Sequence, residues 1–348
     1  MTVTKRAFTV IEPLDPVFYE LVARRSDILL TKLDPKAPRQ DIEAVIACSH
    51  AYAIGATRST TPPGLVADAQ LLQRSPNLLV VSSHGAGYDS VDLEACTRAG
   101  IVAVNQSGGN AEAVAEHVLG MMLCLSKRII ETDRFMRRQP GLRREAFMGR
   151  NVLEKTLGII GIGHVGTRLA QLCRGLEMRI IACDPYLPAD EIARRGAQKS
   201  ALEDLLRQSD FVSVNCPLTD ETRGMLGARQ YALMPKHAYF ITTARGGIHD
   251  EAALEEALRE HRIAGAGLDV WQTEPPPLSH PLLQLDNVLL SNHSAGVTSE
   301  SRRTMAQIGA EQLIDVLDGK RPPRLLNPEA WPAYSKRFQR ILGFAPAP

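Results

Sequence analysis

The sequence has almost no net charge, no long apolar run and no paired cysteines. Its 40 Lys and Arg residues nearly balance its 39 Asp and Glu residues, which leaves a formal charge of +1. This balance provides neither a basic footprint for nucleic acid nor a charged face for a membrane surface. No apolar stretch reaches the ~20 residues that span a bilayer. We therefore expect a soluble protein with no nucleic-acid or membrane partner.

The cysteines provide no disulfide framework and no metal site. The six of them lie at positions 48, 96, 124, 173, 183 and 216, without a CxxC pair or metal-ligand spacing. Free thiols and no bound metal are expected. The first residues, MTVTKRAFTV, lack the pattern of a signal peptide. Together these features predict a cytoplasmic protein.

The chain alternates between apolar runs and helical patterns, and its 348 residues suit two domains. This alternation predicts α/β domains with doubly wound parallel sheets. A nearly continuous apolar helix is expected at 113–130, capped by Asn110, and another near 298, capped by Thr298 or Ser299. Strands are predicted at 7–12, 43–49, 78–83, 101–105, 157–161, 178–184, 211–216, 238–244, 264–270 and 287–292.

Three glycines form a G-x-G-x-x-G pattern between a predicted strand and a predicted helix at 167–177. Gly161 permits a tight turn, Gly163 lets a pyrophosphate approach the backbone, and Gly166 lets the helix pack against the strand. Free N–H groups at the helix N-terminus would then bind the phosphates. His164 lies inside this loop and is interpreted as a spacer rather than a catalytic residue.

An acidic residue follows the glycine loop at the distance expected of a dinucleotide site. Asp184 ends the next predicted strand, 21 residues after Gly163. Its carboxylate would accept hydrogen bonds from the adenosine ribose and repel a 2′-phosphate. Asp184 is followed by Pro185 and Tyr186, and not by an arginine that could pair with a 2′-phosphate, although Arg194 lies farther along. The pattern predicts NAD rather than NADP as the cofactor.

Polar residues follow three later strands: Arg245 in ITTARGG, Glu274 in GLDVWQTEPP and His293 in SNHSAG. Ligands bind at the carboxyl ends of strands in doubly wound sheets, so these side chains should converge. Arginine suits a substrate carboxylate, histidine can transfer a proton, and a carboxylate can orient that histidine. Each residue alone is more often an ordinary polar residue. Together, behind a dinucleotide loop, they predict hydride transfer between NAD and a 2-hydroxy acid.

At these residues the chain resembles the D-isomer-specific 2-hydroxyacid dehydrogenase family over nearly its whole length. The resemblance implies a Rossmann-type cofactor domain at 107–301, inserted in a flavodoxin-like substrate domain at 1–106 plus 302–348. It also implies a homodimer formed through the cofactor domain. The matching segments are SHGAGYDSVDL (83–93), AVAEHVLGMML (113–123), KTLGIIGIGHVG (155–166), CPLTDETRGML (216–226), TTARGGIHDEAAL (242–254), AGLDVWQTEPPP (266–277) and SNHSAGVTSES (291–301).

The family resemblance also implies individual roles. Arg245 would bind the substrate carboxylate and polarise its carbonyl, His293 would be the acid/base, and Glu274 would orient His293 and raise its proton affinity. The loop Gly85, Ala86 and Gly87 would offer backbone N–H groups to the carboxylate. Implied cofactor contacts are Gly161, Gly163, His164, Val165, Gly166, Asp184, Cys216, Pro217, Thr243, Ala244, Asp269 (at the nicotinamide carboxamide), His293, Ala295 and Gly296.

The substrate side chain is expected to contact His50, Tyr52 and His84, because SHAYAIG (49–55) follows a predicted strand. Such a lining favours a small polar 2-oxo acid such as glyoxylate or hydroxypyruvate. The chain departs from the family pattern at Asn215, where relatives often have histidine, and at Asn292, where they often have proline.

Two other functions are compatible with the same residues. One is an NADH-sensing binding protein like the family's corepressor members, which keep the fold. The other is a dehydrogenase of the same fold that acts on a small non-carboxylate anion such as phosphite or formate, because Arg245 can bind any small anion.

Overall fold

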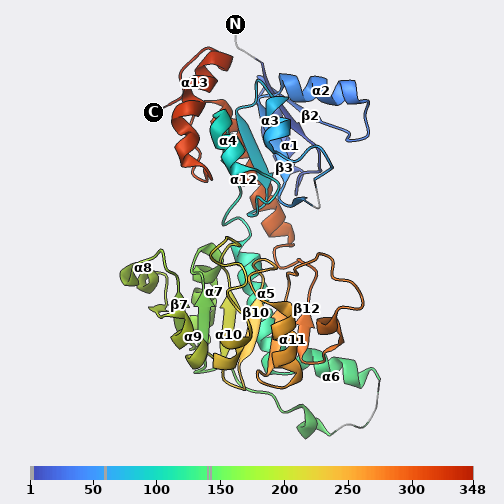
Figure 1. Ribbon diagram of the computed structural model, residues 1–348, viewed down its shortest axis with the longest axis vertical. Helices are drawn as coiled ribbons and strands as arrows, with labels where there is room; N and C mark the ends of the chain where they lie inside the picture. The colour runs from blue at the N-terminus through green and yellow to red at the C-terminus, as the bar shows by residue number, and fades with distance from the viewer. Residues whose placement is uncertain (1–3, 59–60, 139–140, 142, 348) are drawn as a thin grey trace. The chain divides into compact units, whose positions relative to one another are not determined.

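The computed structural model describes residues 4–58, 61–138, 141 and 143–347. The chain divides into two compact units, Met1–Asn110 with Thr298–Pro348, and Ala111–Val297. The sequence predicts that the chain passes from one domain to the other between residues 106 and 107 and between residues 301 and 302. Each unit contains a parallel sheet with helices on both faces, which confirms the predicted fold class (Figure 1).

The first unit has a five-stranded parallel sheet in the order β2-β1-β3-β4-β5. This is the strand order of flavodoxin-like folds. Side chains alternate between the two faces of β3: Ala51 and Ala53 face one apolar cluster, and Tyr52 and Ile54 face the other. The strands are β1 (Lys5–Thr9), β2 (Ile28–Lys32), β3 (Ala51–Gly55), β4 (Val80–His84) and β5 (Val102–Val104).

Two helical layers cover this sheet, and the C-terminal part of the chain supplies two helices of one layer. On that face lie α1 (Val17–Ala23), α12 (Ser299–Leu317) and α13 (Trp331–Leu342). On the opposite face lie α2 (Arg39–Cys48), α3 (Ala69–Gln73) and α4 (Leu93–Ala99). As predicted, Thr298 caps α12: its hydroxyl oxygen accepts a hydrogen bond from the Ser301 N–H.

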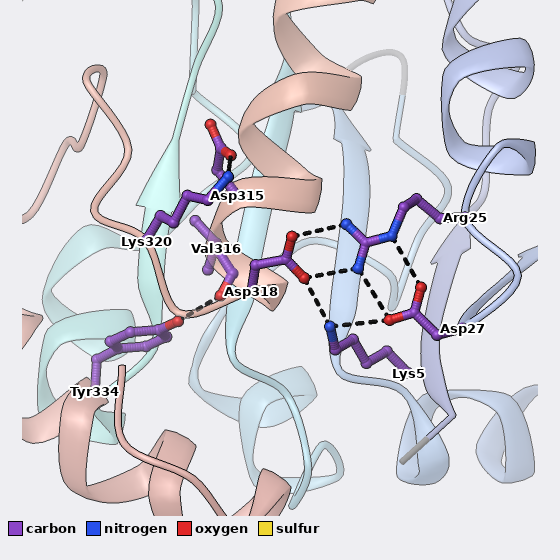
Figure 2. Close-up of polar contacts among 8 residues, drawn as sticks. All are labelled: Lys5, Arg25, Asp27, Asp315, Val316, Asp318, Lys320 and Tyr334. Atoms are coloured by element: carbon purple, nitrogen blue, oxygen red, sulfur yellow. Dashed lines mark hydrogen bonds and ion pairs between the residues drawn. The ribbon is translucent and has the colours of Figure 1, made fainter. Parts of the chain in front are cut away.

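A cluster of four charged residues joins the start of the chain to the end of α12 (Figure 2). Lys5 Nζ lies 3.1 Å from Asp27 Oδ2 and 2.8 Å from Asp318 Oδ1. The Arg25 guanidinium donates to the same two carboxylates. These contacts fix β1 against a helix that follows it by about three hundred residues in the sequence.

The strand predicted at 43–49 is wrong, because this segment belongs to helix α2. Ile42, Val45 and Ile46 follow the spacing of one helix face and pack on the second cluster of the first unit. A short apolar run alone does not distinguish a buried strand from a buried helix. The strand begins at Ala51 instead, inside SHAYAIG (49–55), the segment expected to follow a strand.

The second unit has a seven-stranded parallel sheet in the order β12-β11-β10-β9-β6-β7-β8. Counted from β6, this is the 3-2-1-4-5-6 order of dinucleotide-binding folds with one further strand, and the order reverses between β6 and β9. The strands are β6 (Thr156–Ile160), β7 (Arg179–Cys183), β8 (Gln198–Lys199), β9 (Phe211–Val214), β10 (Tyr239–Thr242), β11 (Gly265–Leu268) and β12 (Val288–Leu290).

Helices α9 (Leu202–Gln208), α10 (Ala228–Leu233) and α11 (Glu251–Arg259) cover one face of this sheet. Helices α5 (Ala111–Ser126) and α7 (His164–Arg174) cover the other, and α8 (Ala189–Arg194) precedes β8. The helix predicted at 113–130 ends at Ser126, and α6 (Ile129–Met136) begins after Arg128, whose φ is 54°. Within the described residues, no helix is long and apolar enough to cross a membrane.

Candidate active site

The predicted site residues of the second unit follow the carboxyl ends of its strands. Gly161 follows β6, Asp184 follows β7, Arg245 lies after β10, Asp269 follows β11 and His293 lies after β12. All six strand pairings are parallel, so these positions share one edge of the sheet. In the same way, Cys216 and Pro217 follow β9.

The glycine loop leaves space where a pyrophosphate would lie. A Cβ added at Gly161 would lie 2.8 Å from the Cys216 nitrogen, and one at Gly166 would lie 2.5 Å from the Gly161 oxygen. A Cβ at Gly163 would meet no atom within 4 Å. Gly163 is also the N-cap of α7, without a side-chain cap, so the helix N-terminus is open to an anion. These features fit a dinucleotide.

Asp184 and an unpredicted arginine hold the backbone of this loop. Asp184 Oδ2 accepts a hydrogen bond from the Ile162 N–H at 3.2 Å. Arg195 Nη1 donates to the Ile162 oxygen at 2.7 Å and pairs with Glu191. Arg194, the arginine that lies farther along the chain after Asp184, pairs with its neighbours Asp190 and Glu191. No pattern in the sequence identified Arg195, because its role depends on the conformation of α8.

The structure brings Glu274 and His293 together. His293 Nδ1 lies 2.8 Å from Glu274 Oε2, and both side chains are about two-thirds buried. The Trp271 N–H donates to the other oxygen of Glu274 at 3.1 Å. Burial raises the pKa of Glu274, but the hydrogen bond and charge of His293, the Trp271 N–H and the Arg245 charge together hold it below its ordinary value. Glu274 is therefore an anion at neutral pH and accepts a hydrogen bond from the Nδ1–H of His293.

Arg245 lies beside the segment that carries Glu274. Its Nη1 donates to the Ala244 oxygen at 2.7 Å. A Cβ at the next residue, Gly246, would lie 1.9 Å from the Trp271 oxygen. Only glycine permits this approach, which places the Trp271–Glu274 segment against the turn after β10.

Asp269 is buried and holds the turn that carries His293. Its backbone oxygen accepts from the His293 N–H at 2.7 Å. Its carboxylate accepts from the Ser294 N–H at 2.8 Å and the Ala295 N–H at 2.9 Å. The sequence implied a nicotinamide contact for Asp269 but did not predict this bracing, and it also missed Ser291, whose hydroxyl donates to the same carboxylate.

In the first unit, the Gly85–Gly87 loop has its carbonyl groups fixed. The oxygens of Gly85, Ala86 and Gly87 accept from Gln106, Asn105 and Ser83. The Gly85 N–H donates to Ser83 O at 3.1 Å, which removes it from the set of donors predicted for a carboxylate. The N–H groups of Ala86 and Gly87 make no hydrogen bond to the described residues.

Two predicted substrate contacts are corrected by the structure. Tyr52 lies within β3 with no exposed surface, stacks on Phe8 at 4.2 Å and donates its hydroxyl to the Leu65 oxygen. His50 precedes β3, at the edge of the sheet opposite to the loop after β4, and its Nδ1 accepts from the Arg6 N–H. Both errors follow from placing a strand at 43–49 instead of 51–55.

His84, the third predicted substrate contact, is also buried. It ends β4, and its ring lies 5.2 Å from that of Phe18. Burial lowers the pKa of His84 to about 4, so the ring is neutral near pH 7. With only 6% of its surface exposed, His84 is part of the packed interior of the first unit and does not line an open pocket.

The NAD-binding domain of the D-isomer specific 2-hydroxyacid dehydrogenases matches residues 119–295. Glyoxylate reductase from Aeropyrum pernix is 40% identical over 268 residues, which cover 75% of this chain and 80% of that protein. The chain belongs to the D-isomer specific 2-hydroxyacid dehydrogenase family. D-3-phosphoglycerate dehydrogenase from Archaeoglobus fulgidus is 38% identical to this dehydrogenase over 252 residues, 72% of this chain and 48% of that protein.

Solved structures agree with this assignment. A 2-hydroxyacid dehydrogenase from Ketogulonicigenium vulgare Y25 superposes with a TM-score of 0.79 at 26% identity, covering 94% of this chain and 99% of that one. The dehydrogenase is an NAD-dependent oxidoreductase that interconverts 2-hydroxy and 2-oxo acids, as predicted.

Proposed function

We propose that this dehydrogenase reduces a small 2-oxo acid, such as glyoxylate or hydroxypyruvate, with NADH. The hydrogen bond between His293 and Glu274 carries the proposal, because it leaves Nε2 of the same ring to donate a proton. Glyoxylate reductases from Aeropyrum pernix and Korarchaeum cryptofilum, 40% and 37% identical to this chain, support the choice of substrate.

In this proposal each side chain has a separate task. The nicotinamide supplies the hydride when NADH is bound. Arg245 binds the substrate carboxylate and polarises the carbonyl with its fixed set of donors. His293 gives its Nε2 proton to the carbonyl oxygen as the alcohol forms. Glu274 stabilises the protonated ring and fixes its orientation. In the reverse direction, neutral His293 takes the proton back.

We also assign binding roles to residues around these three. The N–H groups of Ala86 and Gly87 supply two donors for the substrate carboxylate. Gly161, Gly163 and Gly166 form the pyrophosphate cradle, with Asp184 at the adenosine ribose. Further cofactor contacts are proposed at His164, Val165, Cys216, Pro217, Thr243, Ala244, Asp269, Ala295 and Gly296.

We propose a cytoplasmic homodimer formed through the second unit. Among the described residues of its segment 129–153, four large apolar side chains are exposed: Ile129 at 49%, Met136 at 78%, Met148 at 75% and Leu153 at 49%. Such side chains are typical of a surface that a partner covers. The six free cysteines suit a reducing compartment. In analytical ultracentrifugation, the wild type is expected to sediment as a dimer and Met136→Lys to form a weaker dimer. A monomeric wild type would contradict the proposed assembly.

A panel of substrates tests the proposed reaction. NADH or NADPH is mixed with glyoxylate, hydroxypyruvate, pyruvate and bulkier 2-oxo acids, and the loss of absorbance at the reduced nicotinamide band is followed. The highest kcat/KM is expected with NADH and the two small polar acids. Phosphite and formate, tested with NAD, cover the alternative anions. Activity with either of these and none with any 2-oxo acid contradicts the proposal.

A further inference from the structure

The carboxylate of Asp269 is the central acceptor of the turn around His293. The side chain is 1% exposed. Oδ1 accepts from the Ser291 hydroxyl at 2.5 Å and from the Ser294 N–H, while Oδ2 accepts from the Ala295 N–H. Asp269 therefore fixes residues on both sides of His293.

Ser291 also connects this turn to the segment that carries Glu274. The Ser291 backbone oxygen accepts from Trp271 Nε1 at 3.1 Å. The backbone N–H of Trp271 in turn donates to Glu274 Oε1. A displacement of Ser291 would therefore disturb both members of the Glu274–His293 pair.

His117, on helix α5, extends the chain of hydrogen bonds beyond Ser291. Its Nε2 lies 3.0 Å from the Ser291 hydroxyl oxygen and 4.0 Å from Asp269 Oδ1. The imidazole is partly buried, with 28% of its side chain exposed. Helix α5 packs closely on β11, because a Cβ at Gly267 would lie 2.9 Å from Met121 Sδ. His117 therefore lies on a helix that packs closely against β11, the strand that precedes Asp269.

The protons in this chain have a fixed direction. The Ser291 hydroxyl donates its one proton to Asp269 Oδ1. The Ser291 oxygen can then only accept a hydrogen bond from the N–H of His117 Nε2. The hydrogen bonds therefore run from His117 Nε2–H to the Ser291 oxygen, and from the Ser291 O–H to the Asp269 carboxylate. A neutral imidazole donates the first of these bonds only when its proton is on Nε2.

We propose that His117 is a positioning residue for the reaction. By donating to Ser291, it holds the Asp269 carboxylate in the orientation that fixes the turn of His293. This inference rests on the proposed role of His293 as the proton donor. His117 itself exchanges no proton with the substrate.

Substitutions of His117 distinguish a hydrogen-bond donor from a side chain that only fills space. In His117→Leu, kcat with glyoxylate is expected to fall about 10- to 100-fold, the range of a small misplacement of a reacting group. KM for glyoxylate and Kd for NADH should change little, because the cofactor and carboxylate sites remain. His117→Gln, whose amide can donate from a similar position, should restore most of the kcat.

His237→Leu is the matched control. His237 lies before β10, at the opposite edge of the same sheet, and its Nε2 is 3.1 Å from Asp210 Oδ1. This variant also loses a histidine–carboxylate contact, and its kcat should equal that of the wild type.

Hydrogen exchange of the peptide 291–297 provides a readout independent of activity. The Ser294 and Ala295 amides should exchange faster in His117→Leu than in the wild type or His117→Gln. If the wild type reduces no 2-oxo acid, the proposed function fails, while this exchange still tests the chain of bonds. If His117→Leu does not fold, Ser291→Ala, which removes the central hydroxyl, should show the same faster exchange. Unchanged kcat and exchange in His117→Leu, or a loss that glutamine does not rescue, overturns the inference.

Discussion

The contact between Glu274 and His293 joins residues 19 positions apart on two different segments of the second unit. The sequence could predict both, because each follows a strand whose carboxyl end points to the cofactor edge. It could not predict the residues that brace them. Ser291, Trp271 and His117 are recognised only from the direction of their hydrogen bonds, which no spacing pattern contains.

The residues that contact the substrate side chain were the least predictable part of the site. His50, Tyr52 and His84 are polar residues near a predicted strand end, but all three are buried in the first unit. A polar residue beside a strand can equally satisfy a backbone group, as His50 does for the Arg6 N–H. Asn292, where relatives often have proline, has an exposed side chain and makes no hydrogen bond within the described chain.

Buried histidines should make this dehydrogenase sensitive to acid. His249 is 2% exposed, and neither ring nitrogen has a partner among the described residues. Burial lowers the pKa of His249 from its ordinary value of 6.5 to about 4. As pH falls through this window, the unfolded chain takes up a proton that the folded one refuses, so stability is lost.

His249→Leu removes this proton uptake. The loss of unfolding free energy between pH 7 and pH 4.5 should be smaller than in the wild type by about 2 kcal/mol. Urea unfolding followed by circular dichroism at both pH values measures the difference. An identical pH dependence in the two proteins would show that His249 is protonated while folded.

Among the elements, the strand–loop–helix unit at β6 and α7 was predicted best and the N-terminal unit least well. Three glycines in fixed spacing allow few alternative conformations, and α7 begins at His164, three residues earlier than expected. The run at 43–49 had no such constraint, and it formed a helix because Ile46 had to reach the core. Backbone geometry fixed by glycine was therefore a stronger signal than hydrophobicity.

The first two glycines of the glycine loop, Gly161 and Gly163, should respond differently to alanine. Gly161 has a φ of 85° and no space for a Cβ, so Gly161→Ala should lower Tm. Gly163 has open space, so Gly163→Ala should keep its Tm but weaken NADH binding, because the added methyl group occupies the pyrophosphate position. Thermal melts and NADH fluorescence titrations check both. Normal NADH affinity in a folded Gly163→Ala protein would place the pyrophosphate elsewhere.

The chain leaves the first unit, forms the second and returns, so contacts between its distant ends matter for stability. Lys5, Arg25, Asp27 and Asp318 form the charged cluster of Figure 2. The hydrogen bond from Arg25 lowers the pKa of Asp318 to about 2 against the opposing effect of burial. The same guanidinium holds the pKa of Asp27 well below its ordinary value. This stabilisation is present above pH 3.8, the ordinary value, and is lost as pH falls toward 2.

Asp318→Asn should lower the unfolding free energy at pH 7 by about 1–2 kcal/mol, after allowance for solvent screening. The difference from the wild type should shrink as pH falls toward 2, where the Asp318 carboxyl becomes partly protonated. Asp315→Asn is the control, because Asp315 pairs with the more exposed Lys320 at the same end of α12 and should change stability little. Equal losses in both variants would contradict the role of the cluster.

The central claim is that His293 transfers the proton while NADH binding depends on other residues. The most direct test measures kcat with saturating NADH and glyoxylate, together with Kd for NADH, in the wild type and in His293→Gln. We predict a fall in kcat of about 10²- to 10⁴-fold, the usual contribution of a general acid, with the NADH affinity retained. A His293→Gln protein that turns over glyoxylate as fast as the wild type would contradict the claim.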